Sequence, residues 1–212
     1  HIACRSFQVF RCLITFLDLK MLKAMLHRLS NTICDENSDI QGFAMQILMT
    51  FNAVTAELTP DRLIEFPQLF WALAACLSTT HEQEFIEVLS SMSKFVSKID
   101  LDSADTVQCL VATFPSDWEG KFDGLQNIIM SGLRSANSYD LSLEFLNNLN
   151  SLKDSKIVAN SETRILFALL SNIANFLQSL DDKEFLAKIS KDCDSLIVLC
   201  EKYNEPALSR LI

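Results

Sequence analysis

The stretch "HEQEFIEVLSSMSKFVSKI", residues 81–99, places its apolar side chains three and four positions apart. They are Phe85, Val88, Leu89, Met92, Phe95, Val96 and Ile99. This spacing gathers them on one face of an α-helix, whose side chains return to the same face every three or four residues. Similar spacing recurs along nearly the whole chain, and no strand-like alternation lasts more than a few residues. The sequence therefore predicts an all-α protein.

The helices are expected to be separated by short breaks. The apolar stripes and breaks predict helices at residues 4–17, 20–33, 40–58, 60–66, 67–77, 81–99, 104–114, 124–135, 138–152, 161–180 and 182–203. Ser38 or Asp39 is expected to cap the helix that follows the polar turn 35–39. Thr59 is expected to cap another, with Pro60 at its first position. Pro67 should end or kink that helix at the residue before it.

Glycine and proline are scarce, with four of each among 212 residues, whereas 49% of the chain is apolar. Such a composition disfavours a β-sandwich or barrel and favours long helices joined by short turns. The helix pairs recur at roughly 40 residues, which is within the range of HEAT and armadillo repeats. We expect a HEAT/armadillo-like helical-repeat solenoid, with a compact irregular helical bundle as the alternative.

The chain does not begin with Met and starts within a helical pattern, so residues 1–212 are expected to be one helical-repeat segment of a much larger protein. No apolar run of 18 uncharged residues is present, and no membrane insertion is expected. The net charge is −9 and the cations are scattered. Because nucleic-acid binders usually carry a basic face, the charge disfavours a nucleic-acid partner and favours a basic protein partner.

Catalytic and metal-binding patterns are incomplete. "HEQEF" begins like the zinc-protease motif but has Phe85 where the second His is required, so His81 is better explained as a residue at a helix start. The seven Cys include no closely spaced pair, and those in apolar helical patterns (Cys4, Cys12, Cys76, Cys109 and Cys200) are expected to be reduced and buried. We expect no enzyme, no cofactor and no metal.

The acidic turn contains Asp35, Glu36 and Asp39 but lacks the full twelve-residue calcium pattern with its closing Glu. A solvated turn between helices is the favoured interpretation. These three acids remain candidates for contacting a partner protein.

The stretch "PSDWEGKFDGL", residues 115–125, holds two of the four Gly and one of the two Trp. We expect a structural corner at residues 114–124. Its structural residues are expected to be Pro115, Trp118, Gly120, Phe122 and Gly124, with both aromatic rings folded back onto the flanking helices. Gly124 is expected to open the next helix. In the alternative interpretation the corner contacts a partner through Trp118 and Glu119.

Four blocks carry a family resemblance: "HIACRSFQVFRCL", "LSNTICDENSDIQGFAMQIL", "FPQLFWALAACLSTTHEQEFIEVLSSMSKFV" and "FPSDWEGKFDGLQNIIMSGLRS". Together they resemble the C-terminal region of the Furry-like cell morphogenesis scaffolds, in their fungal form. The likeness spans residues 1–135 and weakens from Tyr139 onward.

The resemblance implies a HEAT/armadillo-like, non-enzymatic scaffold. It would support activation of an NDR/LATS-type Ser/Thr kinase with its Mob coactivator, in polarised growth and cell separation. The implied location is the cytoplasm and the cell cortex at growth sites, and the implied partners are the kinase, Mob and other parts of the same scaffold. A generic α-solenoid adaptor, such as a transport or trafficking receptor, is the alternative.

Overall fold

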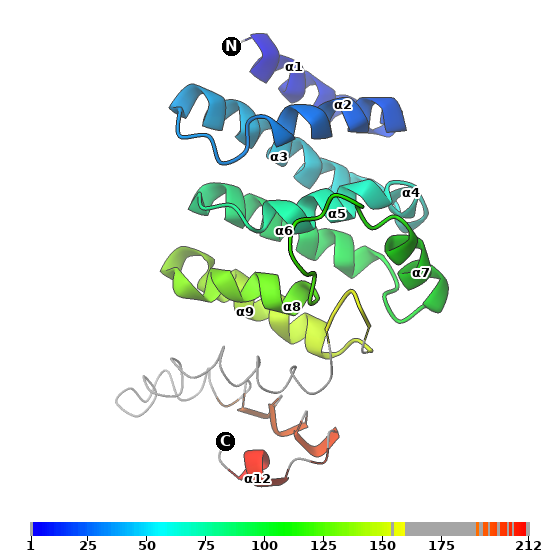
Figure 1. Cartoon of the computed structure of the whole chain (residues 1–212), viewed down its shortest axis with the longest axis vertical. Coiled ribbons are helices and arrows are strands. Elements are labelled where there is room, and N and C mark those ends of the chain that lie inside the picture. Colours follow the sequence, from blue (N-terminus) through cyan, green and yellow to red (C-terminus); the bar gives the residue numbers. More distant parts are fainter. Residues whose placement is uncertain are drawn as a thin grey trace. The chain divides into compact units, whose positions relative to one another are not determined.

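The computed structural model describes residues 2–153, 155–159, 190, 193–194, 196–198, 200–202, 204 and 206–210. Its elements are α1 (Ile2–Phe10), η1 (Arg11–Phe16), α2 (Leu19–Ser30), α3 (Ser38–Glu57), α4 (Pro60–Ile64), α5 (Pro67–Cys76), α6 (Glu82–Lys98), α7 (Ala104–Ala112), α8 (Leu125–Ile129), η2 (Met130–Arg134), α9 (Ala136–Asn150) and α12 (Pro206–Ser209) (Figure 1). Over these residues the only β-pairing is one isolated bridge, Ser155–Ala159. The all-α prediction is confirmed.

The chain divides into two compact units, unit 1 (residues 1–122) and unit 2 (residues 123–212). The division falls within the corner expected at residues 114–124. The helix predicted at 161–180 lies outside the described residues, as does much of the one predicted at 182–203.

Local chemistry sets most helix boundaries as predicted. Thr59 precedes α4 with Pro60 at its first position, and the break at Phe66 lets Pro67 open α5. One cap differs: α3 begins after Asn37, whose side-chain oxygen accepts the N–H of Asp39 at 2.9 Å. Asn37 has the extended backbone of an N-cap, whereas Ser38 is already helical, so the prediction of Ser38 or Asp39 was wrong by one or two residues.

Helices α3 and α6 pack side by side and run parallel. Gln41 near the start of α3 contacts His81 at the start of α6, with 3.4 Å between their side-chain nitrogens. In mid-helix, Asn52 donates to Glu87 at 2.6 Å. At the far end, Lys98 of α6 donates to the carbonyl of Leu58, just past the end of α3, at 2.9 Å. A cation at this end complements the negative end of the α3 dipole.

The first helical segment packs on α3 in the same direction. The Phe7 and Phe43 rings meet edge to face, with centroids 5.6 Å apart. One turn on, the Arg11 guanidinium donates to the side-chain oxygen of Gln46 at 3.0 Å and to the Thr50 hydroxyl at 3.3 Å. Polar contacts along this parallel stack of α1/η1, α3 and α6 join residues 35 to 42 positions apart. This separation lies near the roughly 40 residues expected between successive helix pairs.

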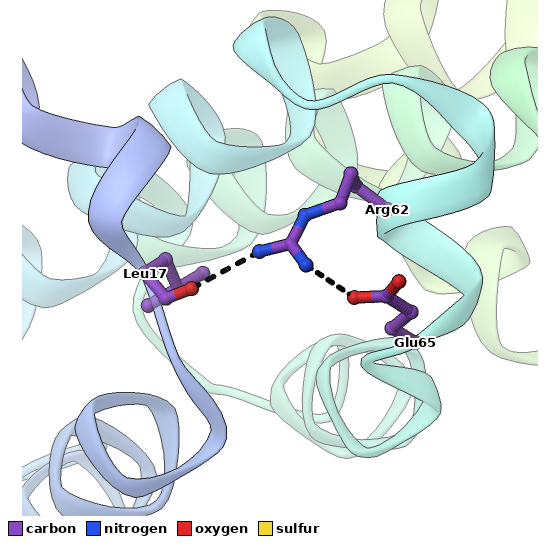
Figure 2. A network of polar contacts seen from close by, with 3 residues as sticks. All are labelled: Leu17, Arg62 and Glu65. Atoms are coloured by element: carbon purple, nitrogen blue, oxygen red, sulfur yellow. Dashed lines mark hydrogen bonds and ion pairs between the residues drawn. The ribbon is translucent and has the colours of Figure 1, made fainter.

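Figure 2 shows how the break after η1 is fastened to α4. Arg62 of α4 donates to the carbonyl of Leu17 at 3.3 Å and pairs with Glu65 at 2.5 Å. Its guanidinium also lies over the ring of Phe66, 5.5 Å from the centroid. The side chain of Leu17 is buried. The N-terminal helical segment is thus held at both ends, by α3 and by α4.

The centre of unit 1 is α5, which is buried on nearly all sides. Its buried residues are Pro67, Leu69, Phe70, Trp71, Leu73, Ala74 and Cys76. A helix that is apolar all round belongs in a core, because no face of it suits water. Helix α5 packs against α6 and α7.

Unit 2 is built on α8, η2 and α9. The buried side chains of Gln126 and Asn150 join α8 to the end of α9 through a 3.0 Å hydrogen bond. The N–H of Leu125 donates to the carbonyl of Ile157 at 2.9 Å. The segment 155–159 therefore packs against the N-terminus of α8.

Candidate protein-interaction site

An aromatic cluster fixes the corner that follows α7. Trp71 of α5 meets Phe114, Trp118 and Phe122 with ring centroids 4.8, 6.0 and 5.1 Å away, all near perpendicular. The three corner rings also contact one another. Edge-to-face pairs of this kind contribute about 0.5–1.5 kcal/mol beyond the area they bury. The corner is therefore attached to the core through one side chain of α5.

Trp71 itself is fixed by a hydrogen bond. Its indole N–H donates to the carbonyl of Leu110 near the end of α7 at 2.9 Å, and its side chain is buried. The sequence interpretation missed Trp71, because it lies in the apolar stretch 66–77 where any large residue fits a core helix. Its one distinguishing signal was being the other of the chain's two Trp.

The backbone of the corner turns tightly. The N–H of Trp118 donates to the carbonyl of Pro115 at 3.4 Å, and Gly120 has φ +80°, a conformation that glycine adopts at little cost. Gly124 has φ +97° and opens α8, as predicted. It belongs to unit 2, where a Cβ would lie 2.5 Å from the carbonyl oxygen of Val158.

The outer side of the corner remains accessible. Phe114 is 39% exposed, and Pro115, Trp118 and Phe122 are half-buried. Asp117 and Glu119 are exposed beside these rings. Aromatic residues ringed by charge are typical of protein contact sites, so this surface suits a partner segment with apolar and basic side chains.

The acidic turn is held by short-range bonds. The carboxylate of Asp35 accepts the N–H of Asn37 at 2.8 Å, and Asn37 in turn accepts from Asp39. The side chains of Glu36 and Asp39 are exposed. Because α3 and α6 run parallel, the turn lies where two positive helix ends come together, and acids there stabilise both helices. These acids thus have a structural function even without a partner.

The cysteines differ in exposure. Burial raises the pKa of the Cys76 thiol to about 12, with Cys34 and Glu84 adding to the effect, so Cys76 is a neutral thiol rather than a nucleophile. Cys200 is also buried, and all seven are free thiols. Cys12 is exposed and Cys4 and Cys109 are only half-buried, contrary to the prediction of buried thiols.

The described residues hold neither a metal site nor a membrane span. Among them, no group of three or more His, Cys, Asp or Glu side chains is arranged to hold a metal ion. None of the described helices combines the length and the apolar character needed to cross a membrane. His81 directly precedes α6, at the helix start expected for it.

Comparison with known proteins shows to which protein family the chain belongs. Residues 67–212, more than half of the chain, match the family model described as "Cell morphogenesis C-terminal". The chain belongs to this family. The match continues to residue 212, so the relationship is not confined to residues 1–135.

Two fungal relatives match over the whole chain. "Cell morphogenesis protein PAG1" of Saccharomyces cerevisiae is 67% identical over 212 residues, and "Cell polarity protein mor2" of Schizosaccharomyces pombe is 35% identical over 214 residues. The chain spans 9% and 10% of the length of these relatives. No solved structure matches the chain. The resemblance to the fungal form of the Furry-like cell morphogenesis proteins is confirmed.

Proposed function

We propose that this chain is a non-catalytic interaction segment of a large cell morphogenesis scaffold, folded as a HEAT/armadillo-like solenoid. The scaffold supports activation of an NDR/LATS-type Ser/Thr kinase with its Mob coactivator, in polarised growth and cell separation. It acts in the cytoplasm and at the cell cortex. The observation that carries the proposal is the 67% identity to a cell morphogenesis protein across all 212 residues.

The parallel stack of unit 1 supports the solenoid. Helices α1/η1, α3 and α6 follow one another in the same direction at a separation near that of the repeat, as the first helices of successive helical repeats do. Solenoids of this kind present extended surfaces to protein partners. The named relatives favour this function over that of a transport or trafficking receptor.

The partner surface is assigned to the two acidic turns of unit 1. One carries Asp35, Glu36 and Asp39, and the other carries Glu119 beside the half-buried ring of Trp118. Both fit a basic protein surface, since the whole chain has a net charge of −9. Exposed charges of this kind act mainly on association rate and specificity.

Calorimetric titration of the chain with a purified NDR-type kinase–Mob complex at physiological salt tests the proposal. Saturable binding is expected, and the double substitution Glu36→Gln/Asp39→Asn should weaken it roughly two- to fivefold, the range for exposed charge pairs. Physiological salt is needed because it screens long-range attraction to any basic protein.

The matched control is Asp61→Asn/Asp105→Asn, which also removes two charges from exposed acids in the first turns of helices, α4 and α7. An equal loss from both double variants would mean that only net charge matters. No binding by the unaltered chain would overturn the assignment of the kinase contact to this segment, while its place in the family would stand.

A further inference from the structure

Exposed apolar side chains gather at one end of unit 1. Among the described residues the large exposed apolar side chains are Val9, Leu13, Phe16, Leu19, Met21, Met49, Phe114, Leu141 and Val198. Five of the nine fall between residues 9 and 21. Phe16 is 70% exposed and Val9 61% exposed, which is costly for a surface that never meets a partner.

Val9, Leu13 and Phe16 form a row on one side of the α1/η1 segment. Their spacing of four and three residues is that of one helix face. The segment kinks at Leu13, whose backbone is non-helical (φ −125°, ψ 23°) and whose side chain is 47% exposed.

The buried side of the same segment is already occupied. Phe7 and Arg11 contact α3, and Ile14 and Leu17 lie in the core. In the parallel stack, α3 packs against a helix on either side, α1/η1 on one and α6 on the other. The row of Val9, Leu13 and Phe16 is thus the exposed apolar side of the stack's first helix.

The charge around this row differs from that of the rest of the chain. The first 34 residues carry five cations (Arg5, Arg11, Lys20, Lys23 and Arg28) and one acid (Asp18), a net charge of +4 in a chain of −9. Arg5, Lys20 and Lys23 are exposed. The occupant of this surface should therefore pair an apolar face with acidic flanks.

We propose that the row of Val9, Leu13 and Phe16 is the docking face for an amphipathic helix with acidic flanks, contributed by another part of the same scaffold and running parallel to α1. The relatives are about ten times as long as the region that this chain matches, and the family model describes the C-terminal part of such proteins. Most of their length thus precedes this region. The docked helix continues the parallel stack by one member. This inference does not depend on the kinase proposal.

The test compares the isolated chain with a full-length chimera in which residues 1–212 replace the matching region of the Saccharomyces relative. Hydroxyl-radical footprinting measures how fast each side chain is oxidised and so reports its exposure. Oxidation of Phe16 should fall about fivefold or more in the chimera, as expected when a largely exposed ring becomes buried. Met49, 39% exposed on α3, is the matched reference and should change less than twofold.

A paired substitution gives an independent readout. Leu13→Glu/Phe16→Glu should leave the melting temperature of the isolated chain nearly unchanged, because both side chains are already exposed there. In the chimera the same change should expose the row, so the oxidation rate of Val9 should rise to its value in the isolated chain.

Equal oxidation of Phe16 in the chain and the chimera would overturn the proposal. It would also be overturned if the isolated chain formed dimers that protect Phe16, because the occupant would then be a second copy. Protection of Phe16 by vesicles containing phosphatidylserine, with none in the chimera without vesicles, would identify an anionic membrane as the occupant instead.

Discussion

The two turns of unit 1 that the sequence singled out are built in different ways. The turn at residues 35–39 is held by hydrogen bonds between residues two positions apart. The corner after α7 is held by the ring of Trp71, which comes from a helix more than 40 positions earlier in the chain. Turns that look alike in sequence can thus be held either by local capping or by attachment to a distant core helix. Substitutions in the two kinds of turn should change the unfolding free energy by different amounts.

The largest effect is expected at the centre of the aromatic cluster. Trp71→Ala removes a buried ring that meets four others and donates to Leu110, and should destabilise unit 1 by about 4 kcal/mol. Trp118→Ala removes a half-buried ring at the rim and should cost about 2 kcal/mol. Denaturant unfolding of both variants measures the difference.

Titration of the Trp118→Ala variant with the kinase–Mob complex separates structure from binding. We expect it to lose more stability than binding affinity, because Trp118 attaches the corner to Trp71. A variant that melts like the unaltered chain yet no longer binds would show that Trp118 is a partner contact instead.

The glycines of the corner sharpen the comparison within one segment. Gly124→Ala should destabilise by about 3 kcal/mol, because it combines a positive φ with a Cβ only 2.5 Å from the Val158 carbonyl. Gly120→Ala has a positive φ but open space around the Cβ, and should cost about 1 kcal/mol. Thermal unfolding checks the order, and a Gly120 effect as large as that of Gly124 would contradict the assigned contact.

The smallest effect is expected at the acidic turn. Asn37→Ala removes the cap of α3 and should cost about 1 kcal/mol. Glu36→Gln, one residue earlier and exposed, should change the unfolding free energy by less than about 0.5 kcal/mol. Urea unfolding measures both. A loss at Asn37 that matched the loss at Trp71 would mean that this turn, too, is fixed by distant packing.

Several helix boundaries followed from the sequence because their causes are local. Thr59-Pro60 and Phe66-Pro67 restrict the backbone within one or two residues, and the structure breaks its helices there. The cap of α3 was missed by one or two residues, since Asn37, Ser38 and Asp39 all have cap-forming side chains. Which of the three residues is the N-cap depends on which one has an extended backbone, and in the structure this is Asn37.

Exposure of the N-terminal segment was harder to predict. The apolar helical pattern predicted a buried Cys12, and this side chain is exposed. In the structure α1 is followed by the 3₁₀ segment η1 with a non-helical backbone at Leu13, and the apolar sequence alone gives no sign of this change.

The sequence by itself determined the all-α class and most of the turns. Each of these depends on hydrophobic period and turn chemistry within a few residues. The tertiary structure alone decided that α1/η1, α3 and α6 run parallel, that Trp71 anchors the corner, and that Val9, Leu13 and Phe16 remain uncovered. These features depend on packing between residues 35 or more positions apart, where many pairings satisfy the same apolar pattern and only one fills the core.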